Sequence, residues 1–97
     1  MSNKKIIYNL NHLKKILSKH KKTKKIVHCH GVFDLLHIGH IKYFQKSKSY
    51  GDILLVSVTS SEFINKSPNR PIFSNENRVS AIASLECVDY VFLNHSK

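Results

Sequence analysis

Residues 26–58 read IVHCHGVFDLLHIGHIKYFQKSKSYGDILLVSV, and this stretch decides the fold. Its first part, residues 26–30, is apolar and β-branched up to the first glycine, which predicts a strand. Two glycines then predict a loop over residues 31–39, followed by a helix that ends at Gly51. Residues 53–58 are almost all apolar, as in a strand of a parallel sheet that helices cover on both faces. The order strand, helix, strand predicts a right-handed crossover between parallel strands.

Both flanks of this stretch extend the same pattern. Before it, leucine and isoleucine recur at helical spacing between residues 9 and 20, with lysines at other positions, which predicts an amphipathic helix. After it, Ser74 can cap a further helix, and residues 88–93 supply a third strand. The fold class that we expect is therefore α/β, a Rossmann-like parallel sheet with helices on both faces and three strands, which is one half of a doubly wound fold.

The expected domain organisation follows from this pattern. Residues 1–25 are predicted to form a basic amphipathic helix and a linker, and residues 26–97 an α/β domain that is cut short at its C-terminal end. A sheet of three strands would leave the strand at residues 26–30 at an edge, where an apolar strand tends to associate. We therefore expect a homodimer, or a further domain that is fused to this one or associated with it.

Length and composition exclude several classes of protein. The chain has 97 residues, of which 41% are hydrophobic, so it can bury one small core and is not compositionally disordered. No apolar stretch approaches the about 20 residues that a membrane span requires, and no signal-peptide pattern follows the N-terminus. We therefore expect a cytoplasmic protein without a membrane span. Cys29 and Cys87 show no CxxC spacing, so a disulfide framework or a zinc finger is not predicted.

The formal net charge of +10 comes almost entirely from the N-terminal quarter of the chain. Residues 1–25 contain nine lysines and no acid, whereas residues 26–97 contain seven basic and six acidic side chains. Such a run can attract nucleic acid, an acidic membrane surface or an anionic substrate, or it is simply a solvated helix face. The lysines are not interleaved with aromatic residues, which argues against nucleic acid as the partner.

Residues 31–40, which read GVFDLLHIGH, hold the densest set of polar side chains. They follow the first predicted strand and open a helix. In a parallel sheet that position is a crevice, where backbone N–H groups and the helix dipole attract a phosphate. His37 and His40 can reach one anion together, and Gly39 would let a ligand approach the backbone closely. The loop therefore predicts an anion site.

Two further histidines allow another interpretation. His28 and His30 lie two apart in the predicted strand, so they share one face and are expected to have a structural role. Together with His37 and His40 they would offer four imidazoles to zinc, but no carboxylate or thiolate lies at a known zinc spacing. We therefore predict no metal site made by protein ligands.

The same loop resembles a known superfamily. Residues 37–40, preceded by residues 31–36, are similar to the HxGH signature of the cytidylyltransferase-like nucleotidyltransferases, which include glycerol-3-phosphate cytidylyltransferases and heptose-phosphate adenylyltransferases. The similarity continues in the same order through residues 48–54, residues 65–73, Arg78 and residues 85–91. It is nearest to the bacterial sugar-phosphate and polyol-phosphate nucleotidyltransferases, some of which are fused to a sugar kinase.

The resemblance implies a transferase reaction. A phosphate oxygen of a sugar phosphate or polyol phosphate would attack the α-phosphate of CTP or ATP, and pyrophosphate would leave without a covalent enzyme intermediate. Mg²⁺ would accompany the triphosphate and bridge its oxygens with few protein ligands. The protein would contribute positioning and charge stabilisation.

The resemblance also implies roles for single residues. His37 and His40 would bind the triphosphate and stabilise the transition state, and Lys66 would clamp phosphates. The other nucleotide-binding residues would be Gly31, Val32, Phe33, Asp34, Gly39 and Arg78. Each of the charged residues also has a possible structural role without a ligand. Lys66 can be a solvated loop lysine, Arg78 can pair with an acid on its own helix, and Asp34 can cap the next turn.

The sequence departs from the family pattern in two places. The family carries a second triphosphate motif of the type ISSTxxK or R near its C-terminal end, and no such motif occurs before Lys97. Ser61 stands where an aspartate is usual after the second strand. Half a triphosphate site lacks oriented donors that stabilise the transition state, so we expect the 97 residues alone to be weak or inactive. The alternative is a non-catalytic nucleotide-binding or assembly module.

Overall fold

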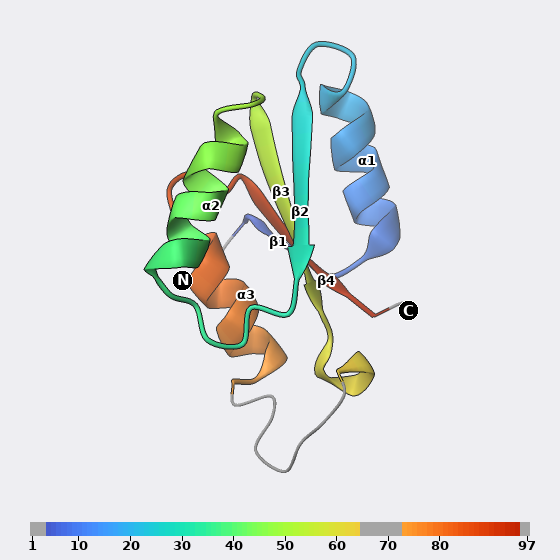
Figure 1. Cartoon of the computed structure of the whole chain (residues 1–97). Helices are drawn as coiled ribbons and strands as arrows, with labels where there is room; N and C mark the ends of the chain where they lie inside the picture. The colour runs from blue at the N-terminus through green and yellow to red at the C-terminus, as the bar shows by residue number, and fades with distance from the viewer. Residues whose placement is uncertain (1–3, 65–72, 96–97) are drawn as a thin grey trace.

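A parallel sheet organises the chain, whose computed structural model describes residues 4–64 and 73–95 (Figure 1). Its strands in those ranges are β1 (Ile6–Ile7), β2 (Ile26–Gly31), β3 (Ile53–Thr59) and β4 (Tyr90–Asn94). The helices are α1 (Leu10–His20), α2 (Ile38–Lys48) and α3 (Asn75–Ala83), with a short 3-10 turn, η1 (Ser61–Phe63). The strands lie in the order β1-β4-β3-β2, and every neighbouring pair is parallel.

β3 occupies the interior of the sheet. It pairs with β2 on one side, where Cys29 lies opposite Val56, and with β4 on the other, where Val56 lies opposite Val91. Residues 53–58 are all buried. The continuous apolar run in the sequence therefore reflects a strand that is covered on both faces. β2 lies at the edge of the sheet, as the sequence predicted for its first long strand.

Helices cover both faces of the sheet, as predicted. α2 and α3 lie on one face and α1 lies on the other (Figure 1). Phe44 of α2 and Val79 of α3 are fully buried in the larger apolar cluster, where each such side chain contributes about 1.5–3 kcal/mol. Leu13 of α1 packs against Leu55 and Phe92 in a second, smaller cluster. No helix in the described ranges is long and apolar enough to cross a membrane.

The number of strands differs from the prediction. The sequence predicted three strands and none before residue 26, whereas Ile6 and Ile7 pair with Val91 and Phe92 as an additional strand beside β4. Two residues are too few to show the alternating pattern by which a strand is recognised in a sequence. The segment is recognised as a strand only because it pairs with β4.

Asp89 fastens the start of β3 to the end of α2. Its Oδ2 accepts a hydrogen bond from Leu54 N at 2.7 Å and one from Lys48 Nζ at 2.5 Å. Asp89 N in turn donates to Leu54 O at 3.0 Å. Leu54 is fully buried, so its N–H depends on a protein acceptor and not on water.

Replacing Asp89 by alanine is expected to lower the free energy of unfolding by about 1–3 kcal/mol, because the N–H of Leu54 would lose its acceptor in a buried position. Urea denaturation followed by circular dichroism measures this loss. The control is Glu86→Ala at an exposed position nearby, which should change stability by less than about 0.5 kcal/mol. Equal losses in the two variants would contradict the role given to Asp89.

Candidate functional site

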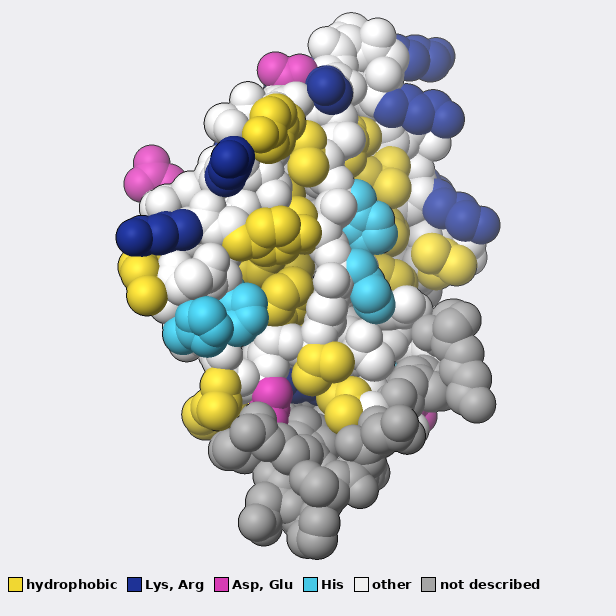
Figure 2. All heavy atoms as spheres, viewed as in Figure 1, with side chains coloured by type: hydrophobic (Ala, Val, Ile, Leu, Met, Phe, Trp, Pro, Cys, Tyr) yellow, Lys and Arg dark blue, Asp and Glu magenta, His cyan; other side chains and the backbone are white. Residues whose placement is uncertain are grey.

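The predicted anion site lies at the carboxyl end of β2. The loop of residues 32–37 leaves β2 there and enters α2 (Figure 1). Figure 2 shows histidine side chains on the surface where α2 begins. The topology therefore brings the predicted loop residues to the edge of a parallel sheet where ligands usually bind.

His37 and His40 cap the N-terminus of α2 with their own rings. His37 Nδ1 accepts a hydrogen bond from Gly39 N at 3.0 Å, and His40 Nδ1 accepts one from His37 N at 3.2 Å. The two ring centroids are 4.1 Å apart. Because both Nδ1 atoms accept from backbone N–H groups, each neutral ring must carry its proton on Nε2. The pair thus holds two N–H donors at the positive end of a helix dipole, an arrangement that suits a phosphate.

Gly39 makes this arrangement possible. A Cβ atom at residue 39 would lie 2.7 Å from His37 Cε1 and 3.0 Å from His37 Nδ1, closer than such atoms normally approach. The sequence predicts that this glycine also admits a ligand to the backbone. In the structure it admits the imidazole of His37, which folds over the first turn of α2.

Phe33 supports the ring of His40. Its φ of 52° lies in the left-handed region, which is rare for a bulky residue and marks a local constraint. This conformation sets the ring edge-on to His40 and to Phe44, with centroid distances of 5.6 Å and 5.1 Å. A Cβ atom at Gly31 would lie 2.7 Å from Phe33 Cζ, so the glycine at the end of β2 provides the space for this ring.

Arg78 lies buried behind the loop, with only 2% of its surface exposed. Its Nη1 donates to Val32 O at 2.9 Å and to Thr59 O at 2.8 Å. Its Nη2 donates to Ser61 Oγ at 3.0 Å and also to Asn75 Oδ1. Within the part of the chain that the structure describes, Nε has no partner. The guanidinium therefore ties the ends of β2 and β3 to α3 through neutral oxygens, and not through an acid of its own helix.

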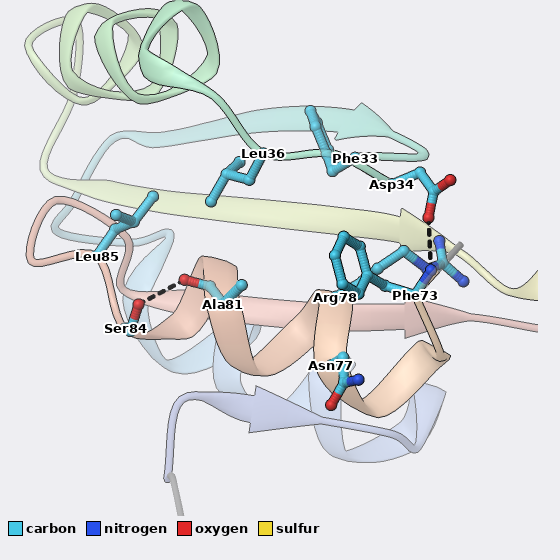
Figure 3. A pocket seen from close by; sticks show the side chains of 9 residues that line it. All are labelled: Phe33, Asp34, Leu36, Phe73, Asn77, Arg78, Ala81, Ser84 and Leu85. Carbon is cyan, nitrogen blue, oxygen red and sulfur yellow. Dashed lines mark hydrogen bonds between the residues drawn. The ribbon is translucent and has the colours of Figure 1, made fainter. Parts of the chain in front are cut away.

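A cavity of about 480 Å³ opens between this loop and α3 (Figure 3). Its walls are Phe33, Asp34, Leu36, Phe73, Asn77, Arg78, Ala81, Ser84 and Leu85. Asp34 Oδ1 accepts a hydrogen bond from Phe73 N at 2.9 Å. Burial lowers the pKa of the Arg78 guanidinium, and the negative charge of Asp34 opposes that shift. Neither His37 nor His40 lines this cavity, so it is a neighbour of the histidine pair and not part of it.

Asn75 joins Arg78 at the start of α3. Lys66 lies outside the described residues. Asn75 was not predicted, yet its Oδ1 accepts from Ser61 N at 2.9 Å and from Ser61 Oγ at 2.8 Å besides binding Arg78. A single asparagine in the first turn of a helix carries no distinctive sequence signal, because polar residues are common there. Neutral oxygens thus stand beside Arg78 where the resemblance would predict a carboxylate.

The histidines of β2 form a separate group. His28 Nε2 lies 2.7 Å and His30 Nδ1 lies 2.5 Å from Ser57 Oγ, and both rings are partly exposed on the sheet face that carries α1. Burial, and to a lesser extent the charge of His30, lowers the pKa of His28. They do not join His37 and His40, which lie on α2 across the sheet. Among the described side chains no group of three or more His, Cys, Asp or Glu could hold a metal ion.

Residues 28–96 match the family described as cytidylyltransferase-like. Similar curated proteins include the bifunctional protein HldE of Geobacter metallireducens, 43% identical over 90 residues, which are 90% of this chain and 18% of that protein. The bifunctional protein HldE of a Nitratiruptor species is 47% identical over 76 residues, 76% of this chain and 16% of that protein. The chain therefore spans less than a fifth of the length of these relatives.

A solved structure gives the same result. The crystal structure of the lipopolysaccharide core biosynthesis protein from Thermoplasma volcanium matches with a TM-score of 0.68 and 39% sequence identity. The match covers 74% of this chain and 59% of that one. The two chains thus share the fold over most of the present sequence.

Replacing Arg78 by alanine is expected to lower the free energy of unfolding by at least about 3 kcal/mol, because several oxygens would lose their donors and a buried space would be left. Urea denaturation measures the loss, and Arg78→Lys, which keeps the charge but has fewer donors, should give an intermediate value. Asn77→Ala, at the exposed preceding residue, is the matched control. A loss below about 1 kcal/mol in Arg78→Ala would contradict the tethering role.

The stability of the chain is expected to fall as the pH drops below neutrality. Burial lowers the pKa of His40, and the charge of His37 lowers it further. The pKa of His28 is lowered as well. The folded chain then binds fewer protons than the unfolded chain, whose histidines titrate at about 6.5, so acidification favours unfolding. The urea midpoint should therefore be lower at about pH 5.5 than at about pH 7.5. His40→Gln should make the urea midpoint less dependent on pH, and His12→Gln on α1 is the control. An identical pH dependence of the midpoint in the wild type and in His40→Gln would contradict the role given to His40.

Proposed function

The chain belongs to the cytidylyltransferase-like family, and on this premise we propose that it is the nucleotide-binding part of a nucleotidyltransferase. The enzyme would transfer CMP or AMP from CTP or ATP to a sugar phosphate or polyol phosphate and release pyrophosphate. The observation that carries the proposal is the pair His37 and His40, held together at the positive end of α2 and at the carboxyl end of β2.

The reaction requires no protein nucleophile. An oxygen of the acceptor phosphate attacks the α-phosphorus, the bond between that phosphorus and the β-phosphate oxygen breaks, and pyrophosphate leaves with the electron pair. The protein then has to hold the phosphates in line and stabilise the charge that develops on their oxygens. The Nε2–H groups of His37 and His40 are donors of the required kind, and the dipole of α2 adds to them. A bound triphosphate would raise the pKa of His40, because a nearby negative charge favours the protonated ring.

The other predicted site residues divide into two groups. We assign Gly31, Val32, Phe33 and Gly39 to the backbone that surrounds the nucleotide. Arg78 and Asp34 are proposed to act on the ligand mainly by holding that loop, since the guanidinium binds Val32 O and the carboxylate binds Phe73 N. Lys66 remains the predicted phosphate clamp.

Mg²⁺ is the cofactor that we propose, carried by the triphosphate. The side chains of residues 4–64 and 73–95 contain no cluster of three acidic, histidine or cysteine ligands, so they do not fit a cation cage made by the protein. At nucleotides Mg²⁺ is usually bound mainly by phosphate oxygens and water, and this is the mode that we propose.

A cytoplasmic location and assembly with a further element remain part of the proposal. Cys29 and Cys87 are both free thiols, which suits a reducing compartment. The outer edge of β2 offers backbone donors and acceptors to another strand, either from a second copy in a homodimer or from a further domain.

Isothermal titration with CTP and with ATP, each with Mg²⁺, tests the nucleotide site. One of the two nucleotides is expected to bind. His37→Ala and His40→Ala should each weaken binding about tenfold or more, because a hydrogen bond to a charged group contributes about 1.5–3 kcal/mol. His12→Ala, an exposed histidine on α1, is the matched control, and circular dichroism verifies that every variant is folded.

Pyrophosphate release separates the enzyme from the alternative. Release in the presence of a sugar phosphate or polyol phosphate would support the transferase. The 97 residues alone are expected to release little pyrophosphate, so the assay uses a chain extended past Lys97 that includes a second triphosphate motif. Nucleotide binding by that longer chain without release from any such acceptor would favour a non-catalytic nucleotide-binding or assembly module. A folded chain that binds neither nucleotide would contradict the proposed site.

A further inference from the structure

Seven lysines gather on one flank of the molecule, and the proposed reaction uses none of them. They are Lys14, Lys15 and Lys19 of α1 and, in the loop that follows, Lys21, Lys22, Lys24 and Lys25. We call this set the lysine face. All of its members are exposed, and Figure 2 shows dark blue side chains along the flank that α1 forms.

Packing of α1 fixes the direction of the lysine face. Leu13, Ile16 and Leu17 lie on one side of α1 and contact Leu55 and Phe92 on the sheet. Because this apolar side is used by the core, the lysines of α1 point away from the sheet and into solvent. The fold therefore presents these charges without using them for its own packing.

Within residues 4–64 and 73–95, no ion pair joins the lysine face to an acidic side chain. Residues 1–25 contain no acid. In the described ranges the ion pairs are Lys48 with Asp89 and His95 with Glu62, which do not involve the lysine face. Asp52, next to this flank, accepts a hydrogen bond from the backbone N of Lys25 at 2.8 Å. The remaining repulsion among the lysines can be relieved by salt or by an anionic surface.

The loop of the lysine face lies at the opposite end of β2 from the histidine pair. Lys25 directly precedes β2, whereas the loop that leads to His37 follows it, and Figure 1 shows these two loops at opposite ends of the sheet. A partner bound to the residues that precede β2 would therefore leave His37 and His40 open to solvent.

We infer that the lysine face docks this protein on an anionic lipid bilayer. Clusters of this size on or beside a helix are typical of segments that bind acidic headgroups. Nucleic acid fits the same surface less well. Residues 9–25 contain no arginine for bidentate phosphate binding and no phenylalanine, tyrosine or tryptophan for stacking on bases. Since the apolar side of α1 is buried in the core, the contact is electrostatic and stays at the headgroups.

Cosedimentation with lipid vesicles tests this inference. The chain is expected to bind phosphatidylcholine vesicles that contain about 30% phosphatidylglycerol and to remain in solution with phosphatidylcholine alone. The bound fraction should fall steeply when the salt is raised from about 50 mM to about 0.5 M. Reversal of two charges in Lys14→Glu, Lys15→Glu should lower the affinity for anionic vesicles more than about tenfold.

The matched control reverses two exposed lysines of α2, Lys42→Glu and Lys46→Glu. Both double variants lower the formal net charge from +10 by twice two, to +6, so only position distinguishes them. The control should retain most of the affinity. An equal loss of affinity in the two double variants would show that only net charge matters and would overturn the inference. No binding to anionic vesicles at low salt, or tighter binding to duplex DNA or single-stranded RNA than to vesicles, would also overturn it. His37→Ala should bind vesicles like the wild type, which separates this result from the nucleotide test.

Discussion

One buried guanidinium holds the carboxyl edge of the sheet together. Arg78 reaches the loop after β2, the end of β3 and the start of α3 at once, because its planar fork of N–H donors can satisfy several acceptors together. Its hydrogen-bond partners are neutral oxygens, and the negative charge of Asp34 opposes the effect of burial on the guanidinium. The loop that leads to His37 and into α2 begins at Val32, whose carbonyl is one of these acceptors. The geometry of the site therefore depends on a residue that does not lie among its histidines.

Gly31 and Gly39 leave space for the side chains of neighbouring residues. Gly31 makes room for the ring of Phe33, and Gly39 makes room for the imidazole of His37. These rings in turn fix neighbouring groups, since Phe33 packs edge-on against His40 and His37 caps the helix on which His40 lies. Close packing of this kind holds donors in place before a ligand arrives, which lowers the entropy cost of binding.

The two ends of the parallel sheet carry different groups of side chains. At the amino ends of its strands, Asp89 and Asp52 bind backbone N–H groups, and the lysine face extends beside them. At the carboxyl ends, the start of α2 and the cavity beside α3 offer donors to a ligand. Parallel strands direct all their carboxyl ends the same way, so the proposed phosphate site and the lysine face lie at opposite ends of the sheet.

The sequence by itself determined the alternation of strand and helix, the buried central strand and the loop that carries His37 and His40, because hydrophobic period, glycine position and motif order are local properties. Tertiary structure alone decided what depends on partners distant in the chain. The two-residue β1 exists only through β4, and the acceptor of Arg78 on the loop lies 46 positions away from it. His28 and His30 were expected to be structural residues, but their exposure and their contact with Ser57 follow from the position of β2 at the sheet edge. Contacts between distant residues are set by packing in three dimensions, and a one-dimensional pattern does not encode them separately.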